Sequence, residues 1–169
     1  MDTLEAIFTR RSIRRYEDRP VPDEQVETLL RAAMAAPSAG NQQPWHFIVI
    51  RARSLLAAIP SVHPYAAMTP NAALAICICG ELTLERHEDY WVQDCSAATQ
   101  NLLLAAHAMG FGAVWLGVHP REQRVRAIRN LLDMPDTVTP LAIIAIGWPA
   151  EATSAVDRFK PERIHRDRW

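Results

Sequence analysis

The segment from Trp91 to Met109 constrains the fold of this chain more than any other. One helical register through it carries Val92, Cys95, Thr99, Leu102, Ala106 and Met109. The other faces are small and apolar as well, with Ala97, Ala98, Ala105 and Ala108. A helix that is apolar all round is a buried helix. We therefore predict a long buried helix that ends at Gly110 and packs partly against a partner subunit.

Helices and strands alternate around this segment. Amphipathic spacing predicts helices that begin at Asp2 and Pro22, a short helix over Ser54–Ile59 and a helix from Pro120 to Leu132. Apolar runs predict four strands, namely Trp45–Ile50, Leu74–Gly80, Phe111–Leu116 and Leu141–Gly147. Elements of both kinds in alternation predict an α+β fold, in which helices flank a mixed central sheet.

Length and composition narrow the class of protein. The 169 residues suit a single domain over residues 1–169, because a fold of this size buries enough apolar surface without metals or disulfides. A hydrophobic content of 49% excludes disorder, and a formal net charge of −1 argues against a nucleic-acid-binding protein. The longest apolar runs, Ala72–Cys79 and Leu141–Ile146, are too short for a membrane-spanning helix of ~20 residues. With three cysteines and no disulfide framework, we expect a cytoplasmic protein.

The final segment, residues 150–169, is polar and basic and has no period of its own. A segment of this kind rarely stays loose on a compact domain. It ends in Trp169, a large aromatic residue. We expect this tail to dock on another subunit.

Arginines crowd the segment Arg10-Arg11-Ser12-Ile13-Arg14. A guanidinium group pairs bidentately with phosphate or carboxylate, and a serine hydroxyl adds a further donor. The segment therefore suits a phosphate dianion. The alternative is a solvated charged surface in which Glu17 and Asp18 pair with the arginines.

The loop from Pro37 to Trp45 combines small residues with side-chain amides. Small residues let a planar ligand approach the backbone, and Asn41 and Gln43 each offer donors and acceptors. We interpret this loop as a candidate binding segment, with an ordinary polar loop as the alternative.

The segment Gly110–Gly117 lacks the Gly-x-Gly-x-x-Gly spacing of a dinucleotide-binding turn. Its strand end, Trp115-Leu116-Gly117, can instead direct backbone N–H groups at a ligand. A buried strand without a ligand is the alternative.

Other chemistry has little support in the sequence. The six histidines show no metal-ligand spacing, and we predict no metal site. Cys77 and Cys79 lie on one face of a strand, where core burial is favoured over metal or redox use. No nucleophile elbow and no Walker loop occurs, so hydrolase and kinase activities are not supported.

Taken in order, these segments resemble the flavin-dependent nitroreductase family in its short single-domain form. The resemblance covers essentially the whole chain. The segments that carry it are Arg10–Arg14, Pro37–Phe47, Ala113–Gly117, Gly147-Trp148-Pro149 and Arg158-Phe159. It implies FMN at the interface of an intertwined homodimer with exchanged C-terminal tails, and NADH or NADPH as electron donor.

The resemblance also implies roles for individual residues. Arg10 and Ser12 contact the phosphate and ribityl end of FMN, with Arg11 beside them and Arg158 as a phosphate ligand from the tail. Arg14 lies near the pyrimidine edge of the flavin and tunes it. The loop of the partner subunit reaches the flavin through Pro37, Ser38, Ala39 and Asn41, with Gln43 nearby. In the segment Trp115–Gly117, the N–H groups of Leu116 and Gly117 lie near flavin N5 and O4.

The chain departs from the family pattern in three places. Many members carry Lys where this chain has Val156, so one phosphate contact is lost or is replaced by Lys160 or Arg163. Longer members carry an extra helical excursion above the flavin, where only His63–Pro70 is available here. Larger members carry an Asn ahead of the second strand. Asn71 lies at a different distance from that strand, and we assign it no role.

The activity implied is an FMN-dependent NAD(P)H oxidoreductase that reduces nitroaromatics, quinones or similar small acceptors by a ping-pong mechanism. No catalytic side chain is required, because the cofactor carries the reaction. Two alternatives remain: other chemistry on the same scaffold, such as reduced-flavin fragmentation or reductive dehalogenation, and a flavin-binding protein without turnover.

Overall fold

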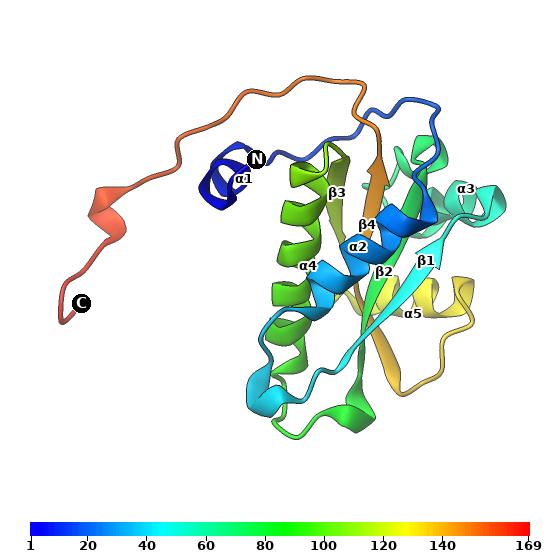
Figure 1. The fold of residues 1–169 in the computed structure, drawn as a ribbon. Coiled ribbons are helices and arrows are strands. Elements are labelled where there is room, and N and C mark those ends of the chain that lie inside the picture. The colour runs from blue at the N-terminus through cyan, green and yellow to red at the C-terminus, as the bar shows by residue number, and fades with distance from the viewer.

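The computed structural model describes all residues from 1 to 169, and its helices and strands interleave along the chain (Figure 1). The helices are α1 (Thr3–Thr9), α2 (Asp23–Met34), α3 (Arg53–Val62), α4 (Trp91–Ala108) and α5 (Glu122–Leu131). The strands are β1 (Trp45–Ile50), β2 (Leu74–Glu81), β3 (Gly112–Gly117) and β4 (Val138–Gly147). Each element expected from the sequence is present, which confirms the α+β class.

The sheet has the strand order β1-β2-β4-β3, and all three pairs of neighbouring strands are antiparallel. The parallel component of the expected mixed sheet is confined to one isolated bridge, in which Ser12 lies beside Ala113 of β3. The segment after α1 runs along the outer edge of β3 there.

Strand β4 begins at Val138 and not at Leu141, because it continues through Pro140. Proline has no N–H for the ladder, which makes it rare inside a strand. The register with β2 shifts here, since Ile78 faces Ala142 and the next residue, Cys79, faces Pro140. The shift leaves Leu141 without a partner on β2. This irregularity makes a proline compatible with the strand.

Two hydrophobic cores lie on opposite faces of the sheet. Helices α2 and α4 pack with Ile76 and Ile144 on one face, and α3 and α5 pack with Cys77 and Ile143 on the other (Figure 1). Because successive side chains of a strand point to opposite faces, β2 and β4 are covered on both sides. This burial accounts for their unbroken apolar sequences.

Helix α4 is the long central helix that the sequence predicts. Its buried side faces the first core, and it is followed by Gly110 with a φ of +85°. The opposite side is open in the single chain, with Gln93 and Gln100 exposed and Leu104 half-buried. Packing of this side against a partner stays a prediction. None of the helices is long and apolar enough to cross a membrane.

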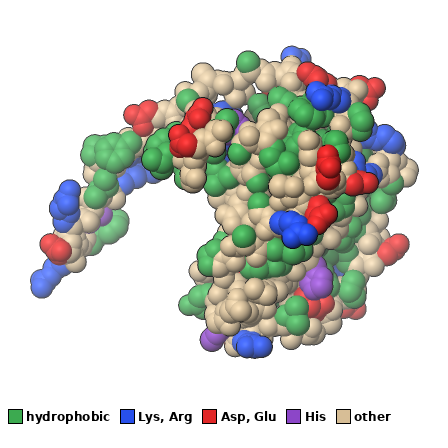
Figure 2. Space-filling model, viewed as in Figure 1, with side chains coloured by type: hydrophobic (Ala, Val, Ile, Leu, Met, Phe, Trp, Pro, Cys, Tyr) green, Lys and Arg blue, Asp and Glu red, His purple; other side chains and the backbone are tan.

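The tail from residue 150 onward leaves the end of β4 and extends away from the domain (Figure 1). It carries exposed hydrophobic side chains, among them Phe159, Ile164 and Trp169. Figure 2 shows hydrophobic atoms along it that nothing in this chain covers. Beyond Glu151, the tail makes no hydrogen bond with the rest of its own chain, and its docking on a partner stays a prediction.

Candidate cofactor-binding site

The arginine-rich segment is fixed to the sheet edge through Ile13. Its N–H donates to the Ala113 carbonyl over 3.0 Å, and its side chain is buried. A Cβ on Gly112 would lie 2.5 Å from Ile13 Cγ2, so the glycine leaves the space that Ile13 fills. Ser12 and Arg14, on either side, remain accessible to solvent.

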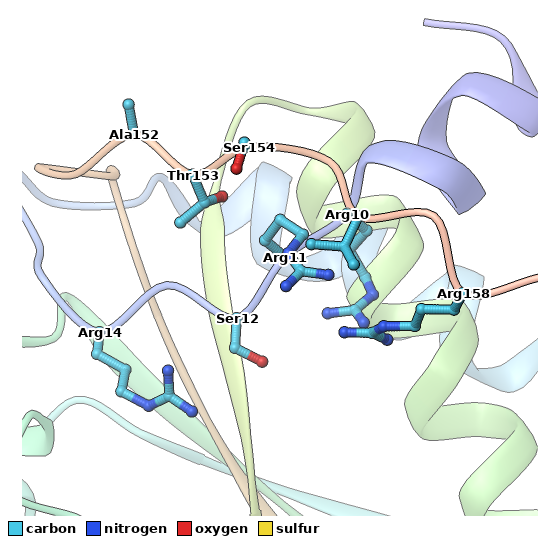
Figure 3. Close-up of a pocket in the computed structure, with 9 residues that line it drawn as sticks. Arg10, Arg11, Ser12, Arg14, Ala152, Thr153, Ser154 and Arg158 are labelled. Carbon is cyan, nitrogen blue, oxygen red and sulfur yellow. The ribbon is translucent and has the colours of Figure 1, made fainter.

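A hollow of 540 Å³ opens between this segment and the tail. Its lining consists of Arg10, Arg11, Ser12, Arg14, Ala152, Thr153, Ser154, Val156 and Arg158. In Figure 3 the side chains of Arg10 and Arg158 point toward each other, with Arg11 and Ser12 beside them. The structure thus brings together predicted site residues from both ends of the chain.

This cluster carries positive charge that no carboxylate neutralises. Burial, together with the charges of Arg158 and Arg11, lowers the pKa of Arg10. The ion pairs of the structure all lie elsewhere. The alternative in which Glu17 and Asp18 pair with these arginines is therefore not realised. Guanidinium groups held together in this way favour an anion between them.

Glu151 orders the backbone of the same segment. Its carboxylate accepts hydrogen bonds from the N–H groups of Arg14 and Arg15, and these bonds lower the pKa of Glu151. The Ala150 N–H donates to the Arg15 carbonyl over 2.9 Å. The Arg14 guanidinium itself is left exposed and without an acidic partner.

Asn71 lies close to Arg14, although the sequence assigns it no role. Both residues line a second hollow of 370 Å³, together with Arg15, Tyr16 and Ala150. An amide beside a guanidinium group offers both donors and an acceptor to a ligand. Sequence reasoning missed Asn71 because its distance from β2 along the chain does not report its position in space.

The structure also shows where the tail residues that differ from the family pattern lie. Val156 lines the large hollow, whereas Lys160 and Arg163 line neither this hollow nor the one at Arg14. Within one chain, then, neither basic residue takes the place of the lysine that Val156 replaces.

The loop from Pro37 to Gln43 lies at the opposite end of α4 from the arginine cluster (Figure 1). One chain therefore does not bring these two predicted parts of the site together. The loop is well defined nevertheless. The Asp94 carboxylate accepts hydrogen bonds from the Ala39 N–H over 2.9 Å and from the Gln42 side-chain amide over 2.7 Å.

Two of the five non-glycine residues with positive φ lie in the same loop. Asn41 and Gln43 have φ values of +54° and +49°, a region that non-glycine residues rarely occupy. The Gln43 N–H donates to Ser38 Oγ over 3.0 Å, and the Gln43 amide donates to Asn41 Oδ1 over 3.1 Å. Strain of this kind is common at ligand-binding segments.

The register of β3 gives the N–H groups of Trp115, Leu116 and Gly117 different directions. The Val118 N–H donates to the Leu141 carbonyl of β4. In an antiparallel pair, successive residues point their N–H groups alternately toward and away from the partner strand. The N–H groups of Trp115 and Gly117 therefore point to the open edge, whereas that of Leu116 points to β4. The expected contact of Leu116 with a ligand through its N–H is not compatible with this register, whereas the contact of the Gly117 N–H stays a prediction.

Gly117 also leaves open space. A Cβ built on it meets no atom within 4 Å, and its φ lies outside the positive region. Neither packing nor backbone conformation within the chain explains the absence of a side chain. The space suits the close approach of a flat ligand to the backbone.

Comparison with known proteins defines the class. A family model described as Nitroreductase family matches residues 7–66 and 61–148. The chain belongs to this family, as the sequence predicts.

Three similar proteins illustrate the match. A relative from Methanothermobacter thermautotrophicus, named as a candidate NADH dehydrogenase/NAD(P)H nitroreductase, is 54% identical over 169 residues, which cover 100% of this chain and 88% of the relative. A solved candidate of the same name from Parabacteroides distasonis has a TM-score of 0.95 at 41% identity, covering 99% of this chain and 98% of that one. A candidate nitroreductase from Desulfovibrio desulfuricans, solved in complex with FMN, has a TM-score of 0.87 at 34% identity, covering 100% and 98%. The nitroreductase fold is thereby confirmed.

Proposed function

We propose that this protein is an FMN-dependent NAD(P)H oxidoreductase that reduces nitroaromatics, quinones or similar small acceptors by a ping-pong mechanism. The observation that carries the proposal is the convergence of Arg10, Arg11 and Arg158 with Ser12 around one hollow that contains no acidic side chain. The FMN named for the Desulfovibrio desulfuricans structure and the NAD(P)H named for the archaeal relative support the choice of cofactors.

The donor set fits a flavin monophosphate. Arg10, Arg158 and Ser12 offer charge-assisted hydrogen bonds to the phosphate, and the chain lacks the Gly-x-Gly-x-x-Gly turn that binds the pyrophosphate of a dinucleotide. From Ala113 to Gly117 the edge of β3 extends for about 13 Å, which gives the ribityl chain and the ring an extended backbone to follow. The open space at Gly117 accommodates the ring.

When bound, FMN supplies the two-electron chemistry that links NAD(P)H to the acceptor. The chain supplies binding and electrostatics. Arg14 and Asn71, which share a hollow, lie where they can meet the pyrimidine edge of the ring. A positive charge there stabilises the negative charge that reduction places on the ring, and the Gly117 N–H holds the other edge.

A second subunit completes the proposed site. The loop Pro37–Gln43 cannot reach the arginine cluster of its own chain, because the two lie at opposite ends of the domain (Figure 1). We propose a homodimer in which each loop contacts the flavin held by the partner, and in which the tails of residues 150–169 are exchanged. A single domain over residues 1–169 and a cytoplasmic location remain parts of the proposal.

The proposal is tested by the visible spectrum of the purified protein, followed by chromatography of the chromophore released on heating. We expect a flavin spectrum and FMN. In the absence of dioxygen, steady oxidation of NADH or NADPH is then expected only when a nitroaromatic or a quinone is present. Release of FAD, or a colourless protein that FMN does not reconstitute, contradicts the proposal. Fragmentation of the reduced flavin in air, or bound FMN without turnover, favours the corresponding alternative.

A further inference from the structure

The carbonyl oxygen of Gly117 accepts two side-chain hydrogen bonds. His63 Nε2 lies 2.9 Å from it, and Arg124 Nη1 lies 3.0 Å from it. His63 follows the last residue of α3, and Arg124 belongs to α5. Because a carbonyl oxygen has two lone pairs, these donors saturate it. A side chain of α5 and the side chain that follows α3 thus both bond to the last residue of the edge strand.

The hydrogen bonds of the His63 ring define its tautomer and its orientation. Its Nδ1 accepts a hydrogen bond from the Tyr65 N–H over 3.3 Å, so the proton of the neutral ring lies on Nε2 and is donated to Gly117. The His63 side chain is buried, with 1% of its surface exposed. Its tautomer and orientation are therefore fixed by the fold.

Arg124 is held from a second direction. Its guanidinium carbon lies 5.4 Å from the centre of the Tyr65 ring, a distance typical of a cation–π contact. It forms no ion pair with a carboxylate. Its charge is therefore held beside Gly117 and is not neutralised by an acidic group.

The peptide unit between Gly117 and Val118 is also fixed from the side of the sheet. The N–H groups of Val118 and His119 both donate to the Leu141 carbonyl, each over 3.0 Å, which forms a β-bulge directly after Gly117. The peptide between Gly117 and Val118 is thus held at its carbonyl by two side chains and at its N–H by β4. The Gly117 N–H belongs to the preceding peptide unit, which joins the fixed one at the Gly117 Cα. These contacts therefore fix one side of the residue that carries the N–H group.

We propose that His63 and Arg124 are positioning residues that hold the Gly117 N–H in place for the edge of the bound flavin ring. The inference rests on the proposed function, since it assumes that FMN lies along β3. It gives the segment after α3 a role that differs from covering the flavin, because His63 acts through the Gly117 carbonyl and not on the ring. Arg124 also places a positive charge near the ring edge opposite the one that Arg14 contacts.

The test compares four variants with the wild-type protein. His63→Leu and Arg124→Met each remove one donor, whereas His63→Gln keeps an amide donor in the place of Nε2. Arg126→Met is the matched control, because Arg126 lies on the same helix and pairs only with the exposed Glu122. The readouts are the backbone order parameter of Gly117 in the FMN-free protein, the dissociation constant of FMN, and the ¹⁵N shift of flavin N5 in the complex.

Loss of either donor is expected to lower the Gly117 order parameter, shift the N5 resonance and weaken FMN binding roughly three- to tenfold, the effect of one hydrogen bond. His63→Gln is expected to keep much of the wild-type behaviour in all three readouts. Arg126→Met changes none of the readouts. Arg124→Met keeps the test decisive if the buried His63→Leu substitution prevents folding. A wild-type protein that does not bind FMN overturns the proposed function. A wild-type protein that binds FMN, with unchanged Gly117 order and N5 shift in Arg124→Met, overturns this inference alone.

Discussion

The Asp94 carboxylate and the Gln42 side-chain amide form a hydrogen bond of 2.7 Å, and both side chains are buried. The Gln42 side-chain oxygen accepts two further hydrogen bonds, from the N–H groups of Arg86 and His87. The pair therefore ties the loop Pro37–Gln43 to α4 and to the segment before α4. A loop that is fixed in this way is prepared to contact a ligand on a partner subunit.

Replacing Asp94 by Ala is expected to reduce the free energy of unfolding by about 2–4 kcal/mol, because the substitution leaves a buried donor on Gln42 and a partly buried donor on Ala39 unpaired. Urea denaturation of the FMN-free protein measures this change. FMN affinity should fall as well, because the loop loses its orientation. Arg126→Ala is the control, because Arg126 is exposed on α5 and pairs only with Glu122, and it should leave both quantities unchanged. A variant as stable as the wild type would show that the loop does not depend on this contact.

Arg10→Ala and Arg158→Ala are each expected to weaken FMN binding roughly 10- to 150-fold. The reason is the loss of a charge-assisted hydrogen bond to phosphate, worth ~1.5–3 kcal/mol. Fluorescence titration of the FMN-free protein measures the affinity, and excess FMN should restore most of the turnover. Arg31→Ala is a suitable control, because Arg31 pairs with Glu27 on the exposed side of α2. Unchanged affinity in either variant would remove that arginine from the site.

The sequence predicts most of the secondary structure because burial leaves a direct trace in the residue pattern. The stretch Leu74–Gly80 is apolar throughout because β2 is covered on both faces, and α4 is rich in alanine because it packs closely in the first core. The start of β4 escapes prediction because Pro140 resembles a break, and only the register shift against β2 makes it compatible with a strand.

The site is predictable where it depends on charge and composition, and not where it depends on tertiary contacts. The clustering of arginines around Ser12 is visible in the sequence. The role of Asp94 is not, although an acidic residue in the first turn of an otherwise apolar helix is a signal that could have been read. Asn71 shares a hollow with Arg14, Glu151 accepts a hydrogen bond from the Arg14 N–H, and His63 bonds to the Gly117 carbonyl. These partners are distant along the chain, and no local pattern marks them.

Gly117→Ala separates folding from cofactor binding. The new methyl group meets no atom of the chain and the backbone conformation tolerates it, so the free energy of unfolding should stay within about 0.5 kcal/mol of the wild type. The methyl group does occupy the space proposed for the ring, and FMN binding should weaken at least about tenfold. Gly112→Ala is the contrasting variant, because its Cβ would collide with Ile13 and destabilise the fold. A Gly117→Ala protein that binds FMN as tightly as the wild type would move the ring away from this strand end.

Truncation after Glu151 tests the exchanged tail. It keeps the contacts of Ala150 and Glu151 with the arginine-rich segment and removes the exposed tail beyond them. Intertwined interfaces often bury more than ~2,000 Å² and leave no stable monomer, so dimer stability and FMN affinity should fall together. Sedimentation velocity and FMN titration measure the two effects, and Arg158→Ala separates loss of the phosphate ligand from loss of the interface. A wild-type protein that is a folded, FMN-loaded monomer at micromolar concentration would refute the proposed dimer.

Arg14 is expected to tune the flavin and not only to hold it. Its guanidinium is exposed, has no acidic partner and shares a hollow with Asn71. A positive charge ~4 Å from the anionic edge of the reduced ring contributes about 4 kcal/mol at an effective dielectric constant near 20. Solvent in an open pocket reduces this contribution to ~1–2 kcal/mol.

For a two-electron couple, 30 mV corresponds to ~1.4 kcal/mol, so Arg14→Ala should lower the midpoint potential by roughly 20–45 mV. The sign follows because the charge stabilises the reduced ring more than the oxidised one. Reduction by NAD(P)H should also become slower, even when FMN is saturating. A redox titration of the FMN-saturated variant measures the shift, and Arg31→Ala is the control, since Arg31 pairs with Glu27 on the exposed side of α2. A potential within a few millivolts of the wild type would mean that Arg14 is a surface charge without influence on the flavin.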